Sequence, residues 1–333
     1  MKHLFVTMAV AAAVLLVSCG DKGIDLSGMS EDDALKVLDE KIHRHPKQAY
    51  LYFERGKLLL NKGKANNDRK FITDAISDLN YAIQHSDAPC EYYTALGDAY
   101  FSSGNVSDSY AAMQKALQKD SSNNEALLKM GEIAYYSKDY DRSMEMLSKV
   151  TEKDKNNLTA LYMKGFIYKE NNDTANAVFY FRKVIDLYPD YEPAYEELGT
   201  LYAERKNGLA VEYLNTALRL QPRNVNVLYG LAKFYQDIEE ADKAIDLYVK
   251  ILEIDPGYKY AWFNRGWIEL VLYEDYASAV EFFTKAIECD ANYTEAYYNR
   301  GVAYEFMGEK DKARQCYDET LRIDPDYTKL QNK

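Results

Sequence analysis

The segment Tyr195-Glu196-Glu197-Leu198-Gly199-Thr200-Leu201-Tyr202, with the following Ala210, Leu214, Ala217 and Pro222, decides the fold. Its apolar residues have helical spacing, yet a glycine stands inside the first helix, where it costs ~1 kcal/mol relative to alanine. A small residue recurs at this place with successive gaps of 41, 34, 34, 34, 33, 34 and 35, at Gly56, Gly97, Gly131, Gly165, Gly199, Ala232, Gly266 and Gly301. A period of this length indicates one helical hairpin copied along the chain.

The residues around each small position follow the pattern aromatic-x2-Leu-Gly-x2-Tyr, then Ala-x3-Phe, then Pro. The eighth copy supplies Tyr297, Gly301, Tyr304, Ala313 and Pro325. The chain therefore resembles the tetratricopeptide-repeat (TPR) family from about residue 49 to residue 325. The resemblance implies an all-α fold: a right-handed superhelical solenoid of about eight helix hairpins, whose first helices form a concave wall. It implies little about activity, because a fold does not determine a function.

The recurrent glycine predicts a close approach between the two helices of each hairpin. We expect small residues of the second helix to be its partners, namely Ala75, Ala177, Ala210, Ala244, Ala279 and Ala313. Large residues of the second helix, such as Leu79 and Phe181, are expected to fill the space between hairpins. A single hairpin cannot bury both of its faces, so residues 30–333 are predicted to stack into one continuous array rather than two compact domains.

The ends of the array depart from the repeat. Residues 30–46 match the second half of a repeat, and Ser30 with Asp33 is close to a capping box, which predicts an extra half-repeat helix. The first gap is seven residues longer than 34, and the polar run at 61–70 predicts an enlarged loop between the helices of the first hairpin. The residues after Pro325 are too few to predict a separate capping helix.

The amino terminus is predicted to lie outside the solenoid. Lys2 and His3 precede an apolar run at 4–17, the layout of a secretory signal. Residues 16–19, Leu-Val-Ser-Cys, resemble the bacterial lipobox. That resemblance implies a signal peptide at 1–18, a lipidated Cys19, and a flexible tether at 19–29. An ordinary signal peptide and an uncleaved anchor are the alternatives, although the run is short of the ~20 apolar residues of a spanning helix.

A lipidated Cys19 places the protein in the cell envelope, lipid-anchored. Gly20 follows the cysteine where an aspartate acts as an inner-membrane retention signal in some bacteria. The absence of that aspartate favours the outer membrane, where the protein would face the periplasm or the surface. The choice between inner and outer membrane remains open.

Composition and motifs argue against several functions. The formal net charge is −12, which is unsuited to nucleic acid because that ligand selects basic surfaces. No zinc-protease, serine-hydrolase or paired-cysteine motif is present, so we expect no enzyme, no cofactor and no metal site. Cys90, Cys289 and Cys316 are expected to be free thiols, with pairing of the last two left open.

The TPR resemblance also indicates which residues of each first helix point into the groove. These positions carry aromatic residues and, in the middle repeats, acidic ones: Tyr135, Tyr162, Tyr229, Tyr260, Phe263, Trp267, Tyr298, Glu132, Glu170 and Glu197. The 31 tyrosines exceed what a groove needs, so many must pack between helices. Asn264 and Asn299 stand where some TPR domains hold a carboxylate, but without a neighbouring lysine, which argues against such a site.

These features predict a non-catalytic protein–protein interaction scaffold or adaptor on the bacterial envelope. Its aromatic and acidic groove would bind basic or neutral segments of partner proteins, such as assembly, secretion or protease components. The alternative is a ligand-binding lipoprotein for a glycan or nutrient, which a closed pocket with a few converging polar groups would favour.

Overall fold

The structure is a computed structural model that describes residues 24–331. Within this range the chain is helical and contains no β-strand, which confirms the all-α prediction. None of the described helices combines the length and the hydropathy needed to cross a bilayer. The signal, the lipobox with Cys19 and the start of the tether lie outside the described residues.

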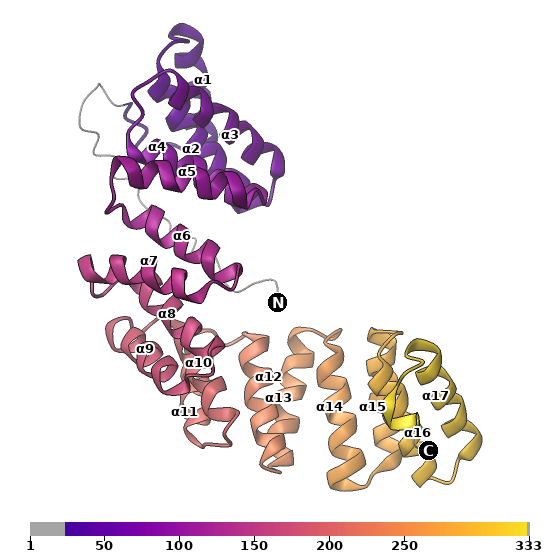
Figure 1. Ribbon diagram of the computed structural model, residues 1–333. Helices are drawn as coiled ribbons and strands as arrows, with labels where there is room; N and C mark the ends of the chain where they lie inside the picture. Colours follow the sequence, from indigo (N-terminus) through magenta and orange to yellow (C-terminus); the bar gives the residue numbers. More distant parts are fainter. Residues whose placement is uncertain (1–23, 332–333) are drawn as a thin grey trace. The chain divides into compact units, whose positions relative to one another are not determined.

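The helices group into two compact units, Met1–Ile167 and Tyr168–Lys333, which are treated separately below. The first unit opens with a lone helix and continues with three hairpins and most of the next helix. Its helices are α1 (Glu31–Arg44), α2 (Ala49–Asn66), α3 (Arg69–Gln84), α4 (Cys90–Ser103), α5 (Val106–Lys119), α6 (Asn124–Tyr136), α7 (Tyr140–Lys153) and α8 (Leu158–Glu170), which runs into the second unit (Figure 1).

The second unit begins with the end of α8 and adds one helix, four hairpins and a short final helix. Its helices are α9 (Thr174–Leu187), α10 (Glu192–Ala203), α11 (Leu209–Leu220), α12 (Val225–Asp237), α13 (Ala241–Ile254), α14 (Lys259–Ile268), the π-helical η1 (Glu269–Tyr273), α15 (Tyr276–Cys289), α16 (Thr294–Phe306), α17 (Lys310–Ile323) and α18 (Thr328–Gln331). Figure 1 shows α12 to α17 standing side by side, each packed on the next.

The turn inside each hairpin has one construction. One residue after the first helix takes a left-handed conformation, and the next residue is the N-cap of the second helix, except after Lys206, where Asn207 precedes the N-cap Gly208. The left-handed residues are Asn67, Gly104, Lys138, Asn172, Lys206, Glu239, Glu274 and Gly308. In five hairpins the following Asp or Asn caps the second helix through its side chain: Asp68, Asn105, Asp139, Asp173 and Asp275.

The recurrent glycine faces a large side chain, and this corrects the predicted packing. A Cβ added at Gly199 would lie 2.5 Å from Cγ of Leu214, and one added at Gly301 would lie 2.6 Å from Cε1 of Tyr317. The same contact recurs between Gly97 and Met113. The glycine therefore makes room for the bulky residue of its own hairpin rather than for the predicted alanine. The bulky residue also packs toward the next hairpin, as predicted, since Leu214 shares a core cluster with Val227 and Met113 shares one with Leu127.

Extra residues are absorbed into helices. The predicted loop at 61–70 is wrong, because α2 continues through Asn66 and the turn consists only of Asn67 and Asp68. The seventh repeat has a single extra residue, since Gly266 and Ala279 are thirteen apart whereas Gly301 and Ala313 are twelve apart. There the helix widens into η1, whose π-type turns hold one more residue than α-helical turns.

An additional helix outside the hairpins lies at each end of the array, α1 before the first hairpin and α18 after the last. Ser30 accepts a hydrogen bond from the Asp33 amide at 3.2 Å and caps α1, as predicted. Leu38 of α1 packs against Leu51 of α2, and both side chains are fully buried. After Pro325 the short helix α18 forms, contrary to the prediction of no separate helix there.

Candidate functional site

The predicted groove residues of the first unit are largely covered. Tyr162 is 6% exposed, and its ring contacts that of Phe166 edge-on at 4.8 Å. Tyr162 is therefore a packing residue, which corrects its place among the accessible anchors. Tyr135 is half-buried, between the rings of Tyr136 and Tyr140 at 5.7 and 5.8 Å.

Glu132 does not offer a free negative charge. Lys129 lies 2.6 Å from the Glu132 carboxylate and 3.5 Å from that of Asp98, and its ammonium is 4.2 Å from the ring centre of Phe101. Lys64 pairs with the same Asp98. Burial and the Asp98 charge raise the pKa of Glu125 nearby. The expected acidic surface is therefore a network of neutralised carboxylates in this unit.

The predicted acidic residues of the second unit differ from each other. Glu197 is paired with Lys169 at 2.7 Å, and its side chain is 15% exposed. Burial raises the pKa of Glu197, and Lys169 opposes that shift. Glu170 is exposed as the last residue of α8. Only Glu170 therefore presents its side chain openly to solvent.

Three of the predicted aromatic residues of the second unit, Tyr229, Tyr260 and Phe263, belong to one cluster of rings. The ring of Tyr260 is 6.2 Å from that of Tyr229, and Phe263 is 5.5 Å from the buried Phe283. Tyr260 is the most accessible member, at 43% exposed. Tyr298 makes separate ring contacts, at 5.9 Å with Tyr317 and 5.3 Å with Tyr327.

Two members of the cluster were missed by sequence reasoning. Tyr258 lies 5.6 Å from Tyr260, and Tyr293 lies 5.9 Å from Tyr260 and 5.1 Å from Phe263. Each is the residue before a first helix. Burial raises the pKa of Tyr258 to about 12 and raises that of Tyr293 as well. A periodic signal exists for them, because each lies four residues after the last residue of a second helix, as do the equivalent tyrosines of other repeats, Tyr191 and Tyr327.

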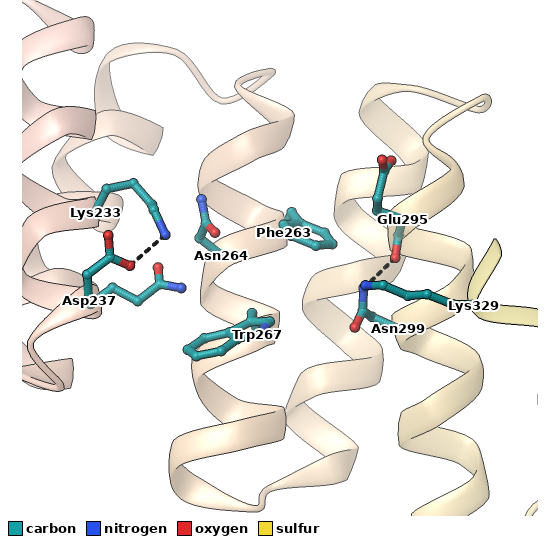
Figure 2. A pocket seen from close by; sticks show the side chains of 9 residues that line it. Lys233, Asp237, Phe263, Asn264, Trp267, Glu295, Asn299 and Lys329 are labelled. Atoms are coloured by element: carbon teal, nitrogen blue, oxygen red, sulfur yellow. Dashed lines mark hydrogen bonds and ion pairs between the residues drawn. The ribbon is translucent and has the colours of Figure 1, made fainter. Parts of the chain in front are cut away.

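A cavity of about 360 Å³ lies beside this cluster. It is lined by α12, α14, α16 and α18 through Lys233, Gln236, Asp237, Phe263, Asn264, Trp267, Glu295, Asn299 and Lys329. Figure 2 shows Lys233 and Asp237 facing Asn264 and Trp267 from one side, and Lys329 approaching Asn299 from the other. Of the predicted anchors, Phe263 and Trp267 reach this cavity.

The charged groups of the cavity balance. Lys233 pairs with Asp237 at 2.9 Å. The ammonium of Lys329 lies 5.3 Å from the ring centre of Tyr298, and Glu295 supplies a second carboxylate. Two lysines therefore line the cavity together with Asn264 and Asn299, although no lysine stands beside these asparagines in the sequence. Lys233 comes from a neighbouring repeat and Lys329 from α18.

A pair of acidic side chains joins α10 to α12 outside the cavity. The Asn224 amide donates to Glu192 at 3.0 Å and to Glu196 at 3.5 Å, while its oxygen caps α12 by accepting from the amides of Asn226 and Val227. Burial, with the charges of Glu192 and Glu197, raises the pKa of Glu196 to about 7. Burial likewise raises the pKa of Glu192, which is 4% exposed.

The remaining reactive residues form no cluster. Cys90, Cys289 and Cys316 are free thiols. Burial raises the pKa of the Cys90 and Cys289 thiols, which lowers their thiolate content. In the described range, no group of three or more His, Cys, Asp or Glu side chains is placed to hold a metal ion.

Comparisons with known proteins give the family of the repeats. Residues 55–195 match the family described as "Cytochrome c-type biogenesis protein H TPR domain", and residues 201–262 and 294–327 match tetratricopeptide-repeat families. No curated protein matches the chain.

Two of the solved structures that resemble this chain are TPR proteins. The C-terminal part of a TPR repeat-containing protein from Cytophaga hutchinsonii is 19% identical, with a TM-score of 0.62, over 72% of this chain and 98% of that one. A tetratricopeptide repeat protein from Parabacteroides merdae is 15% identical, with a TM-score of 0.55, over 73% and 96%. The repeating hairpins, their glycine contacts and these matches agree: the chain carries tetratricopeptide-repeat domains and folds as a TPR solenoid.

Proposed function

We propose that this protein is a non-catalytic scaffold or adaptor of the bacterial cell envelope. In this proposal a lipid on Cys19 anchors it to the membrane, and its TPR domains bind segments of partner proteins. The observation that carries the proposal is the aromatic cluster of the second unit, where the exposed Tyr260 stands among Tyr229, Tyr258 and Tyr293 beside the cavity. Amphipathic aromatic rings of this kind contribute most of the affinity at protein interfaces.

The charges of the wall favour uncharged partner segments. Lysines pair with Glu132, Glu197 and Asp237, so these three carboxylates are less available to select a basic segment, whereas Glu170 stays exposed. The partner class therefore remains a protein of the envelope, such as an assembly, secretion or protease component. The acidic composition of the chain continues to argue against nucleic acid.

Affinity capture from solubilised envelope tests this function. The full chain is compared with a variant carrying Tyr260→Ala and Phe263→Ala, and with Phe179→Ala as a matched control. Phe179 is 59% exposed but lies on α9, the second helix of its repeat. Loss of each wall ring is expected to weaken binding by ~2 kcal/mol or more, while the control captures the same proteins as the wild type.

Folding has to be separated from binding in this experiment. Phe263 packs on the buried Phe283, so its removal destabilises the unit, and melting by circular dichroism is recorded for every variant. Tyr260→Ala alone removes an exposed ring and keeps the core intact. Wild-type capture by folded wall variants would reject the wall as the binding surface.

A ligand-binding lipoprotein is the second candidate, and the cavity is the observation that favours it. Its volume is at the lower end of the range for small-molecule sites, and amide and aromatic side chains converge on it. A glycan or nutrient that binds there with the purified chain alone would support this candidate over the scaffold.

A further inference from the structure

The cavity holds a matched pair of hydrogen-bonding groups on buried side chains. Gln236 is 5% exposed, and its carbonyl oxygen accepts from the Tyr248 hydroxyl at 2.7 Å. Asn264 is 6% exposed, and its amide nitrogen donates to the Tyr229 hydroxyl at 3.0 Å. These two bonds fix the orientation of each amide and occupy one end of it.

The other ends have no protein partner among residues 24–331. They are the NH2 group of Gln236, a donor, and the carbonyl oxygen of Asn264, an acceptor. Both side chains line the cavity. Neither atom is among the fully buried side-chain atoms that lack a partner, so both reach the open space of the cavity, where a ligand that bonds them replaces water.

We propose that this cavity binds the backbone amide of an extended protein segment. The C=O of a peptide group would accept from Gln236 while an N–H donates to Asn264, and an adjacent uncharged side chain would lie against Phe263 and Trp267. This proposal rests on the proposed scaffold function and specifies the chemistry recognised at one point of the wall.

The arrangement favours an amide over a carboxylate or an ammonium ion. A carboxylate has no hydrogen to give to the Asn264 oxygen, and an ammonium ion has no lone pair for the Gln236 donor. The lining carries two lysines and two carboxylates, so it has no net charge to attract an ion. A secondary amide satisfies both groups without a charge.

The two tryptophans of the chain allow a direct measurement. Trp267 lines the cavity, whereas Trp262 lies elsewhere, with its indole bonded to the Pro256 carbonyl at 3.0 Å. The purified full chain is labelled with 5-fluorotryptophan, and Trp262→Phe assigns its two fluorine resonances. N-acetyl-tyrosine N-methylamide is then titrated, with N-acetyl-tyrosine, tyramine and N-acetylglucosamine in parallel.

The capped amide is expected to shift the Trp267 resonance saturably, with a Kd on the order of 1 mM for a ligand of this size, and to leave Trp262 unchanged. Gln236→Glu keeps the oxygen that Tyr248 needs but removes the donor, and should weaken binding about tenfold or more. Gln315→Glu makes the same chemical change on the exposed face of α17 and should have no effect.

Three results would overturn the proposal: no saturable shift with the capped amide, equal binding by folded Gln236→Glu, or tighter binding of the carboxylate, the amine or the sugar. The sugar result would establish a carbohydrate site, and the carboxylate result an anion site formed by the lysines. If the amide-binding proposal is overturned, the scaffold function is still tested separately by the envelope capture experiment. If the wild-type chain captures no envelope protein but shows the Trp267 shift, the scaffold function is rejected and the amide-binding cavity is retained.

Discussion

At the scale of single residues, each recurrent glycine is required by one bulky side chain on the other helix of its hairpin. Gly199 faces Leu214, Gly266 faces Phe283 and Gly301 faces Tyr317. The large residue differs between repeats, while the small one hardly changes. The helix therefore accepts a poor helix former because the core of the hairpin would otherwise lose its largest residue.

Gly199→Ala is expected to destabilise the protein by ~1–3 kcal/mol, because the new methyl would meet Leu214 at 2.5 Å. Gly230 is the matched control: it lies inside α12 with nothing within 4 Å of an added Cβ, so Gly230→Ala should stabilise by ~0.5–1 kcal/mol. Urea unfolding measures both. In a Leu214→Ala background the cost of Gly199→Ala should disappear, and an unchanged cost there would contradict this account of the glycine.

Arg55 offers a second test at this scale. Its guanidinium forms two parallel bonds to Asp78, at 2.7 and 2.8 Å, and a third to Asp39 of α1 at 2.7 Å. Asp78 is 7% exposed, so Arg55→Met would leave a buried carboxylate unpaired and cost roughly 3 kcal/mol.

The matched control for Arg55 is Lys36→Met. It breaks the pair of Lys36 with Asp33, whose side chains are 74% and 62% exposed, and should change the free energy of unfolding by less than ~0.5 kcal/mol. Hydrogen exchange of the backbone amides of α1 to α3 measures the local stability in both variants. Equal protection in the two would show that the Arg55 pair does not hold α1 in place.

At the scale of elements, the burial of Glu196 beside the start of α12 makes the stability of the fold depend on pH. Its pKa is about 7 in the folded protein against 4.5 for an unperturbed glutamate. The folded state therefore binds more protons than the unfolded state between these values, and its stability falls as pH rises from about 4.5 to about 7. This is opposite in direction to the effect of a salt-bridged carboxylate.

Glu196→Gln should remove this part of the pH dependence. The variant is expected to be more stable than the wild type by about 1–2 kcal/mol at pH 8, less than full conversion of the pKa difference because the carboxyl is partly exposed. The difference should vanish near pH 4. Urea unfolding at several pH values measures it, with Glu212→Gln on the exposed face of α11 as the control. A constant offset across pH would refute the role of the Glu196 proton.

At the scale of the whole molecule, the sequence 20–29 stands between the repeats and the proposed lipid anchor at Cys19. The proposal of a lipid anchor predicts that Cys19→Ala abolishes acylation and either releases the solenoid from membranes or leaves an uncleaved precursor. Membrane fractionation and intact mass are the measurements, and Cys90→Ala, a free thiol inside the first unit, is the control. Unchanged processing and fractionation of the Cys19 variant would remove the lipobox interpretation.

The sequence by itself determined the class of fold and the order of the hairpins. Helix propensity, apolar spacing and the glycine period are local or nearly local signals, and a repeat states them many times. The Ser30 cap and the half-repeat helix followed for the same reason. The right-handed sense of the superhelix stays a prediction. The sequence did not determine where the extra residues of the first and seventh repeats are accommodated. A longer loop, a longer helix such as α2 and a π-turn such as η1 are all compatible with the same number of residues.

The tertiary structure alone decided which wall residues are accessible and which charges remain. Tyr162 and Tyr229 each stand three residues before the small residue of their repeat, yet Tyr162 is buried at 6% exposed whereas Tyr229 is partly exposed. Lys169 neutralises Glu197 from 28 residues away, and the cavity draws its lining from four helices. Solvation and pairing depend on all neighbours in space, and the side chains that meet there are set by the packing of one hairpin on the next rather than by any single repeat.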